Sequence, residues 1–132
     1  MAPASDPWWI IGSAAVALHG ADPGNIDDID VVLSVADAGR VLPAIGVALT
    51  PGSSDGQFRS AIYNCWAVPV HPAEFMAGFE LCEEGAWSPV GFATREEVRP
   101  GIFVPSHGEL HALLLRFGRP KDLRRAASLR SA

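Results

Sequence analysis

The chain has 132 residues, of which 48% are hydrophobic, and it carries a formal net charge of −5 at pH 7. This length predicts one domain, large enough to bury about two-thirds of the surface that the unfolded chain exposes. No apolar run approaches the roughly 20 residues that span a membrane, and the negative charge argues against non-specific binding to nucleic acid.

The first predicted element is a short strand that leads directly into a helix. Residues 8–11 form an apolar run suited to a buried strand, and residues 14–18 are good helix formers that end before Gly20. Between them, Gly12 tolerates turn dihedrals and lacks a Cβ, and Ser13 is a favoured N-cap residue. Because a helix N-terminus presents unpaired N–H groups, Gly12 and Ser13 are candidate phosphate contacts. The same pattern is also typical of a simple tight turn.

A second strand is predicted over residues 27–33, where aspartates lead into an apolar stretch. Side chains alternate along a strand, so Asp28 and Asp30 share a face with their Cα atoms roughly 7 Å apart. Two carboxylates at this spacing can hold one divalent ion or two adjacent ions, and a cation relieves their mutual repulsion. The alternative is a solvated strand end in which Asp27 and Asp28 are turn or cap residues.

Together, the Ile-Gly-Ser motif at residues 11–13 and the Asp-Ile-Asp motif at residues 28–30 resemble the signature of a known family. This family is the DNA polymerase beta-like nucleotidyltransferase superfamily, and the likeness is closest to its small single-domain bacterial members. The resemblance implies one nucleotidyltransferase-like domain over residues 1–132. Its expected fold is α+β, a mixed β-sheet with helices packed mainly on one face, followed by C-terminal helices. In that family a third carboxylate comes from a later strand, for which Glu74 is the best candidate.

The middle of the chain predicts a helix, a loop and two strands. The helix is expected over residues 36–49 and the loop over residues 51–56, which is flexible enough to sit over a site. Strands are expected over residues 58–63 and 66–75, joined at Asn64 as a hairpin. Two prolines interrupt the second strand, which places it at an edge or at a bulge. Further short strands are predicted over residues 87–94 and 101–104.

Two helices are predicted at the C-terminal end. Ser106 and Glu109 match a capping box, Gly118 ends the first helix, and Pro120 starts a second helix that runs through Leu129. An apolar stripe on the first helix is expected to lie in the core; it comprises Leu110, Leu113, Leu114 and Phe117.

Charge is distributed unevenly along the chain. Residues 1–94 contain eleven acidic residues and two arginines, whereas residues 95–132 contain four acidic and eight basic residues. The basic segment could stay solvated, fold back against the acidic part, or supply a cation to a triphosphate. Lys121 is the only lysine, which makes it the first candidate for a nucleotide contact.

Histidines and cysteines give weaker signals. His107 and His111 are four residues apart, but the residues between them do not match the zinc-protease pattern. His71 is a candidate for a catalytic role, although histidines are more often packed or at the surface. Cys65 and Cys82 follow no metal-ligand spacing, which favours two reduced thiols in a cytoplasmic protein.

The resemblance implies Mg²⁺-dependent transfer of a nucleoside monophosphate from a nucleoside triphosphate to an unknown acceptor. Asp28, Asp30 and Glu74 would be the catalytic residues and would bind two Mg²⁺ ions. The nucleotide would be bound by Gly12, Ser13 and Lys121. The alternative is a catalytically inactive module on the same fold that binds a nucleotide or a partner. Such a partner would be a second copy or a helical protein, as in toxin–antitoxin pairs.

Overall fold

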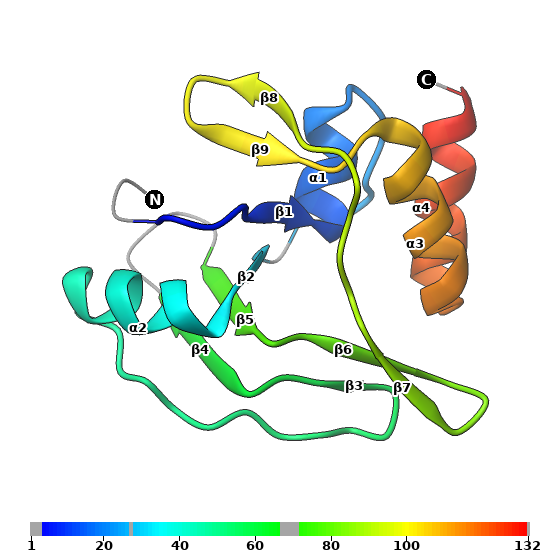
Figure 1. Cartoon of the computed structure of the whole chain (residues 1–132). Coiled ribbons are helices and arrows are strands. Elements are labelled where there is room, and N and C mark those ends of the chain that lie inside the picture. Colours follow the sequence, from blue (N-terminus) through cyan, green and yellow to red (C-terminus); the bar gives the residue numbers. More distant parts are fainter. Residues whose placement is uncertain (1–3, 27, 67–71, 132) are drawn as a thin grey trace.

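The computed structural model describes residues 4–26, 28–66 and 72–131, and its elements follow a β-α-β-α order before a run of strands and two final helices. The core is a mixed four-stranded sheet in the order β1-β2-β5-β4 (Figure 1). Its strands are β1 (Trp9–Ile11), β2 (Ile29–Leu33), β5 (Ala73–Ala77) and β4 (Ile62–Trp66). Strands β2 and β5 are parallel, and the other two pairings are antiparallel. The strands predicted from the first two motifs are therefore confirmed.

The hairpin predicted at Asn64 is wrong. Asn64 lies in the middle of β4 and pairs with Phe75 of β5. Its side-chain amide donates to the carbonyl oxygen of Ala48 at 3.0 Å and to Oγ1 of Thr50 at 2.9 Å. This polar residue therefore ties an edge strand to the segment beside it and does not turn the chain. The connection between β4 and β5 includes residues 67–71, outside the described residues.

Strand β5 is a central strand, which corrects the expectation of an edge or bulged position. Pro72 lies immediately before the first residue of β5, where a missing N–H removes no ladder hydrogen bond. Its carbonyl oxygen accepts from the backbone N–H of Ile29 at 2.8 Å. The register from Ile29 opposite Ala73 to Leu33 opposite Ala77 is continuous. The other proline of this segment, Pro69, lies outside the described residues.

Two smaller sheets complete the β structure. One has the order β3-β6-β7, formed by β3 (Phe58–Arg59), β6 (Glu80–Glu83) and β7 (Ala86–Pro89). The other pairs β8 (Glu96–Arg99) with β9 (Ile102–Val104). Strands β3 and β9 fall within predicted strand regions and β7 overlaps one, whereas β6 and β8 were not predicted.

Four helices lie in the described ranges: α1 (Gly12–Leu18), α2 (Val35–Ala44), α3 (His107–Phe117) and α4 (Pro120–Ser131). Helices α3 and α4 lie side by side, with α1 next to them (Figure 1). Helix α2 starts at Ser34, whose hydroxyl accepts from the backbone N–H of Asp37 at 3.0 Å. It ends well before residue 49 because Gly46, with φ +78°, adopts a left-handed conformation that stops the helix. None of the helices described has the length and hydrophobicity needed to span a membrane.

The capping box predicted for α3 is only half formed. The Ser106 hydroxyl accepts from the backbone N–H of Glu109 at 3.2 Å. The Glu109 carboxylate does not return this bond; it accepts from the backbone N–H groups of Ala93 at 2.8 Å and Thr94 at 2.7 Å. Glu109 therefore fastens the segment before β8 to the start of α3.

The two faces of the central sheet differ in what covers them. One face, with Ile10, Val31 and Phe75, packs against buried residues of all four helices. The other face, with Ile11, Val32 and Met76, packs against Phe79, Leu81, Val90, Leu113 and Phe117. We call this second face the open face, because it also carries three acidic residues that are only half-buried: Asp28, Asp30 and Glu74.

Candidate functional site

One row of side chains crosses the open face through all four strands. Ile11, Asp30, Glu74 and Cys65 are direct register partners on β1, β2, β5 and β4. Direct partners in a sheet point to the same face, so the register alone places Asp30 beside Glu74.

Asp28 completes an acidic cluster with these two residues. It lies two positions before Asp30, so the alternation of side chains puts it on the same face. One carboxylate oxygen from each of Asp28, Asp30 and Glu74 lies within 4.8 Å of the others, and all three residues are half-buried. Such a cluster could hold a metal ion. The structure thus brings together the three acids named from the sequence, whereas their catalytic and metal-binding roles stay predictions.

Crowding of these carboxylates changes the protonation of Asp30. Burial, the negative charge of Asp28, and the hydrogen bond and charge of Glu74 raise the pKa of Asp30 to about 8. At neutral pH and without a cation, the Asp30 carboxyl group therefore keeps its proton and shares it with a neighbour. The carboxylates of the cluster repel one another, and a bound cation would reduce this repulsion.

Gly12 leaves space for this cluster. Its φ of +67° is in the left-handed region that favours glycine, and a Cβ added there would lie 2.8 Å from Oδ2 of Asp30. The missing side chain therefore makes room for the Asp30 carboxylate, a reason that the sequence pattern did not suggest. Ser13 is not the N-cap that was predicted, because Ile11 takes that position and makes no side-chain cap bond. Ser13 itself is buried in the first turn of α1.

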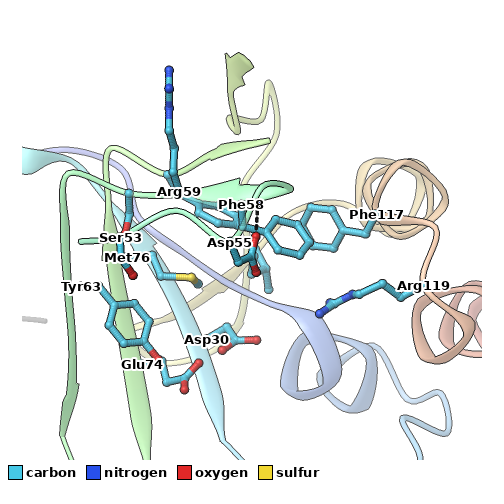
Figure 2. Close-up of a pocket in the computed structure, with 13 residues that line it drawn as sticks. Asp30, Ser53, Asp55, Phe58, Arg59, Tyr63, Glu74, Met76, Phe117 and Arg119 are labelled. Carbon is cyan, nitrogen blue, oxygen red and sulfur yellow. Dashed lines mark hydrogen bonds between the residues drawn. The ribbon is translucent and has the colours of Figure 1, made fainter. Parts of the chain in front are cut away.

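A cavity of about 420 Å³ opens in front of the acidic cluster (Figure 2). Its acidic end contains Asp30 and Glu74, with Tyr63 beside them. Its opposite wall is aromatic and cationic, with Phe58, Phe79, Phe117 and Arg119; the remaining lining residues are Ile11, Ser53, Asp55, Arg59, Ser60 and Met76. The volume is in the range of small-molecule sites, and the cavity combines apolar surface with a few converging polar groups.

Arg119 is the cation that faces this cavity from the C-terminal helices. Its guanidinium lies 4.9 Å from the Phe58 ring centre and 5.8 Å from that of Phe117. Asp122, which is only 1% exposed, accepts from Nε of Arg119 at 2.6 Å and from Nη2 at 3.1 Å. The buried aspartate therefore fixes a planar, permanently charged group on the aromatic wall.

Lys121 lies elsewhere. It lines a second hollow of about 590 Å³, formed by the 22–25 segment and α4, together with Arg124 and Arg125. Arg125 donates to the carbonyl oxygen of Pro23 at 3.0 Å, which ties α4 to the segment that leads to the acidic strand. The nucleotide contact predicted for Lys121 stays a prediction.

The 51–56 segment borders the cavity, as expected for a loop over a site, but hydrogen bonds hold it in place. Its Gly52 N–H donates to the carbonyl oxygen of Ala61 at 3.1 Å, and Asp55 N–H donates to that of Phe58 at 3.1 Å. The Asp55 carboxylate accepts in return from the Phe58 N–H at 2.8 Å, a bond drawn in Figure 2. The backbone N–H groups of Phe58 and Gln57 lower the pKa of Asp55, so it stays ionised in the cavity wall.

Other side chains singled out from the sequence do not join this cluster. His107 Nε2 lies 2.6 Å from the carbonyl oxygen of Leu129, and its ring packs edge-on against His19. Cys65 and Cys82 are free thiols. Within the part of the chain that the structure describes, the acidic triad is the one group with metal-ligand spacing. His71 and Asp27 lie outside the described residues.

Sequence reasoning did not single out Tyr63 or Phe58, although both line the cavity. Neither residue belongs to a recognisable motif, and both reach the site through cross-strand pairing. For Tyr63, its place two positions before Cys65 was a usable signal only once the register of β4 was known.

A comparison with solved structures identifies the fold. The chain is similar to a protein from Thermotoga maritima described as a "putative nucleotidyltransferase", with a TM-score of 0.71 and 24% sequence identity. The match covers 99% of this chain and 84% of that one. Neither a family model nor a curated protein sequence matches the chain. The likeness confirms the predicted α+β, nucleotidyltransferase-like fold, and the narrower superfamily stays a prediction.

Proposed function

We propose that this protein transfers a nucleoside monophosphate from a nucleoside triphosphate to an acceptor. One observation carries the proposal: three carboxylates converge at the open end of a nucleotidyltransferase-like fold, beside a cavity. Neither the acidic cluster nor the fold alone identifies this reaction. Together they supply what nucleotidyl transfer requires, a possible metal site beside a cavity on a nucleotidyltransferase-like fold.

The cluster fits a hard divalent cation, and Mg²⁺ is the one we propose. All three ligands offer carboxylate oxygens, the donors that Mg²⁺ prefers. The raised pKa of Asp30 supports the assignment, because it comes from burial and from the neighbouring charges of Asp28 and Glu74, which a bound cation would offset. A cation held by Asp28, Asp30 and Glu74 would neutralise charge on the phosphate oxygens as pyrophosphate leaves.

The chain's own residues would bind and orient the two substrates. Arg119 presents a fixed positive charge to the phosphates, and Phe58 offers an aromatic surface to an organic ring. Gly12, whose backbone approaches the Asp30 carboxylate, and Ser13 remain the proposed phosphate contacts at the start of α1. Glu74 would accept the proton of an attacking hydroxyl if it does not bind the ion directly.

The proposal is tested by transfer of label from α-labelled triphosphates to acceptors in a cell lysate. Wild type is expected to label one or more acceptors, and Asp30→Asn to lose at least about a hundredfold of this activity, since even outer-shell changes cost 10–100-fold. Asparagine keeps the shape of aspartate, so the variant should fold. The matched control is Glu96→Gln, which neutralises an exposed acid on β8 away from the cavity.

Equal labelling by wild type and Asp30→Asn would contradict the catalytic proposal. Binding of a nucleotide without any labelling would instead support the inactive binding module on the same fold. Because these outcomes differ in binding as well as in labelling, both are measured on the same preparations.

A further inference from the structure

Tyr63 lies next to the third acid of the cluster. It is on β4 opposite Met76, which makes it the diagonal neighbour of Glu74 on the open face. Aromatic side chains span such diagonal positions. Both residues line the cavity, and Figure 2 shows the hydroxyl end of Tyr63 directed toward the Glu74 carboxylate.

A phenol hydroxyl in this position can donate a hydrogen bond to the Glu74 carboxylate. Partial burial, followed by this bond and the negative charge of Glu74, raises the pKa of Tyr63. The group therefore remains a protonated donor at neutral pH. The strand that carries it is fastened too, because the Tyr63 N–H donates to the carbonyl oxygen of Thr50 at 3.0 Å.

Glu74 has different neighbours on its two sides. Toward β2 it faces Asp30, a second acid, and beyond it Asp28. Toward β4 it faces Cys65 directly and Tyr63 diagonally. Tyr63 therefore offers Glu74 an uncharged hydroxyl donor on the side away from the other two acids.

We propose that Tyr63 is a positioning residue whose hydroxyl holds the Glu74 carboxylate in the orientation that lets it share a divalent cation with Asp28 and Asp30. The inference rests on the proposed function, because it assumes that the acidic cluster binds a metal. Metal ligands need such outer partners to fix the oxygen that faces the ion, and their loss costs 10–100-fold in affinity. Tyr63 is the single tyrosine of the chain, so its hydroxyl can be followed without interference.

The first test compares Mn²⁺ affinities of the full chain by electron paramagnetic resonance. Tyr63→Phe removes only the hydroxyl and is expected to bind Mn²⁺ about tenfold more weakly than wild type. Cys65→Ala is the matched control: it changes the direct partner of Glu74 on the same strand and leaves the hydroxyl in place, so its affinity should not change. Melting temperatures in EDTA show whether each variant is folded.

A second readout follows the tyrosine itself. In wild type with ring-labelled tyrosine, addition of Mg²⁺ should shift the NMR signals of Tyr63, because the ion rearranges its acceptor. In Glu74→Gln the shift should disappear. A merely structural tyrosine would show neither the metal-dependent shift nor its dependence on Glu74.

The outcomes separate this inference from the proposed function. Equal Mn²⁺ affinity of wild type and Tyr63→Phe would overturn the positioning role and leave the metal site intact. Equal weakening by Tyr63→Phe and Cys65→Ala would also overturn it, since the cause would then be a disturbed β4 edge. Absence of Mn²⁺ binding by folded wild type would overturn both the inference and the metal site on which it rests.

Discussion

At the residue scale, the environment of Asp30 shifts its titration far from that of an ordinary carboxyl group. It lies between Asp28 and Glu74, under the first turn of α1, and its pKa is raised to about 8. In the unfolded chain the same carboxyl group titrates at its ordinary pKa, near 4. The free energy of unfolding and the affinity for a metal ion therefore both depend on pH through the protonation of Asp30.

The sign of this coupling gives a prediction for the metal-free protein. Between pH 4 and 8 the folded state holds a proton on Asp30 that the unfolded chain has released, so stability falls as pH rises through this window. The slope has an upper limit of about 1.4 kcal/mol per pH unit, the value for one proton. Urea unfolding in EDTA across this range measures it. Asp30→Asn should be less pH-dependent than wild type; parallel curves for the two proteins would contradict the raised pKa.

At the same scale, Gly12 has a structural role beyond the turn that was predicted from the sequence. The glycine-serine pattern suggested a turn that a phosphate can approach, and the residue does start a helix. Its closest constraint is the carboxylate of Asp30, which no local pattern of the chain reveals. The pairing of β1 with β2 creates that contact.

At the element scale, Asp37 holds the start of the chain on α2. Its carboxylate is fully buried and accepts from the backbone N–H groups of Ser5 at 2.9 Å and Asp6 at 2.8 Å. It also pairs with Arg40 one turn later in the helix. The Asp37 N–H, in turn, donates to the Ser34 hydroxyl that caps α2.

Removal of this carboxylate should destabilise the fold without affecting the acidic cluster. Asp37→Ala leaves two backbone N–H groups without their acceptor and is expected to lower the free energy of unfolding by about 2 kcal/mol. Asp37→Asn keeps an acceptor oxygen and should lose less. Denaturant unfolding measures both, and Mn²⁺ affinity should stay at the wild-type value. A loss of stability in Asp37→Asn as large as in Asp37→Ala would show that charge, rather than hydrogen bonding, is the main contribution.

Elements defined by neighbouring residues were predicted well, and elements defined by distant pairing were not. The strand and helix at residues 9–18 follow from apolar runs and a glycine, and α3 and α4 from caps and an apolar stripe. The central place of β5 depends instead on contacts with two distant strands, and the prolines before it suggested an edge. The turn expected at Asn64 is absent for the same reason. The side-chain amide of Asn64 donates to the carbonyl oxygen of Ala48, which is distant in the sequence.

At the scale of the whole molecule, the basic C-terminal segment does fold back onto the acidic part. Arg116 pairs with Glu83 at 2.7 Å, and Arg125 donates to the carbonyl oxygen of Pro23. The first of these is an exposed pair, a class that contributes little to stability. The more important consequence is that the start of α4 presents two cations to two different hollows, Arg119 to the cavity and Lys121 to the second hollow. Their sequence positions differ by two, and Arg119 is distinguished by its packing on Phe58 and its ion pair with Asp122.

This arrangement predicts how a nucleotide stabilises the whole protein. A triphosphate should raise the melting temperature only together with Mg²⁺, because without a cation the acidic cluster repels the phosphates. At a ligand concentration of a hundred times Kd, the gain is about 2.7 kcal/mol. ATP, GTP, CTP and UTP are compared by thermal shift, each variant against its own nucleotide-free melting temperature. Arg119→Ala should lose more of the gain than Lys121→Ala, since Arg119 shares the cavity with Asp30 and Glu74. A larger loss in Lys121→Ala would indicate that the phosphates bind in the second hollow. A rise in melting temperature without metal would contradict the metal-binding role proposed for the three acids.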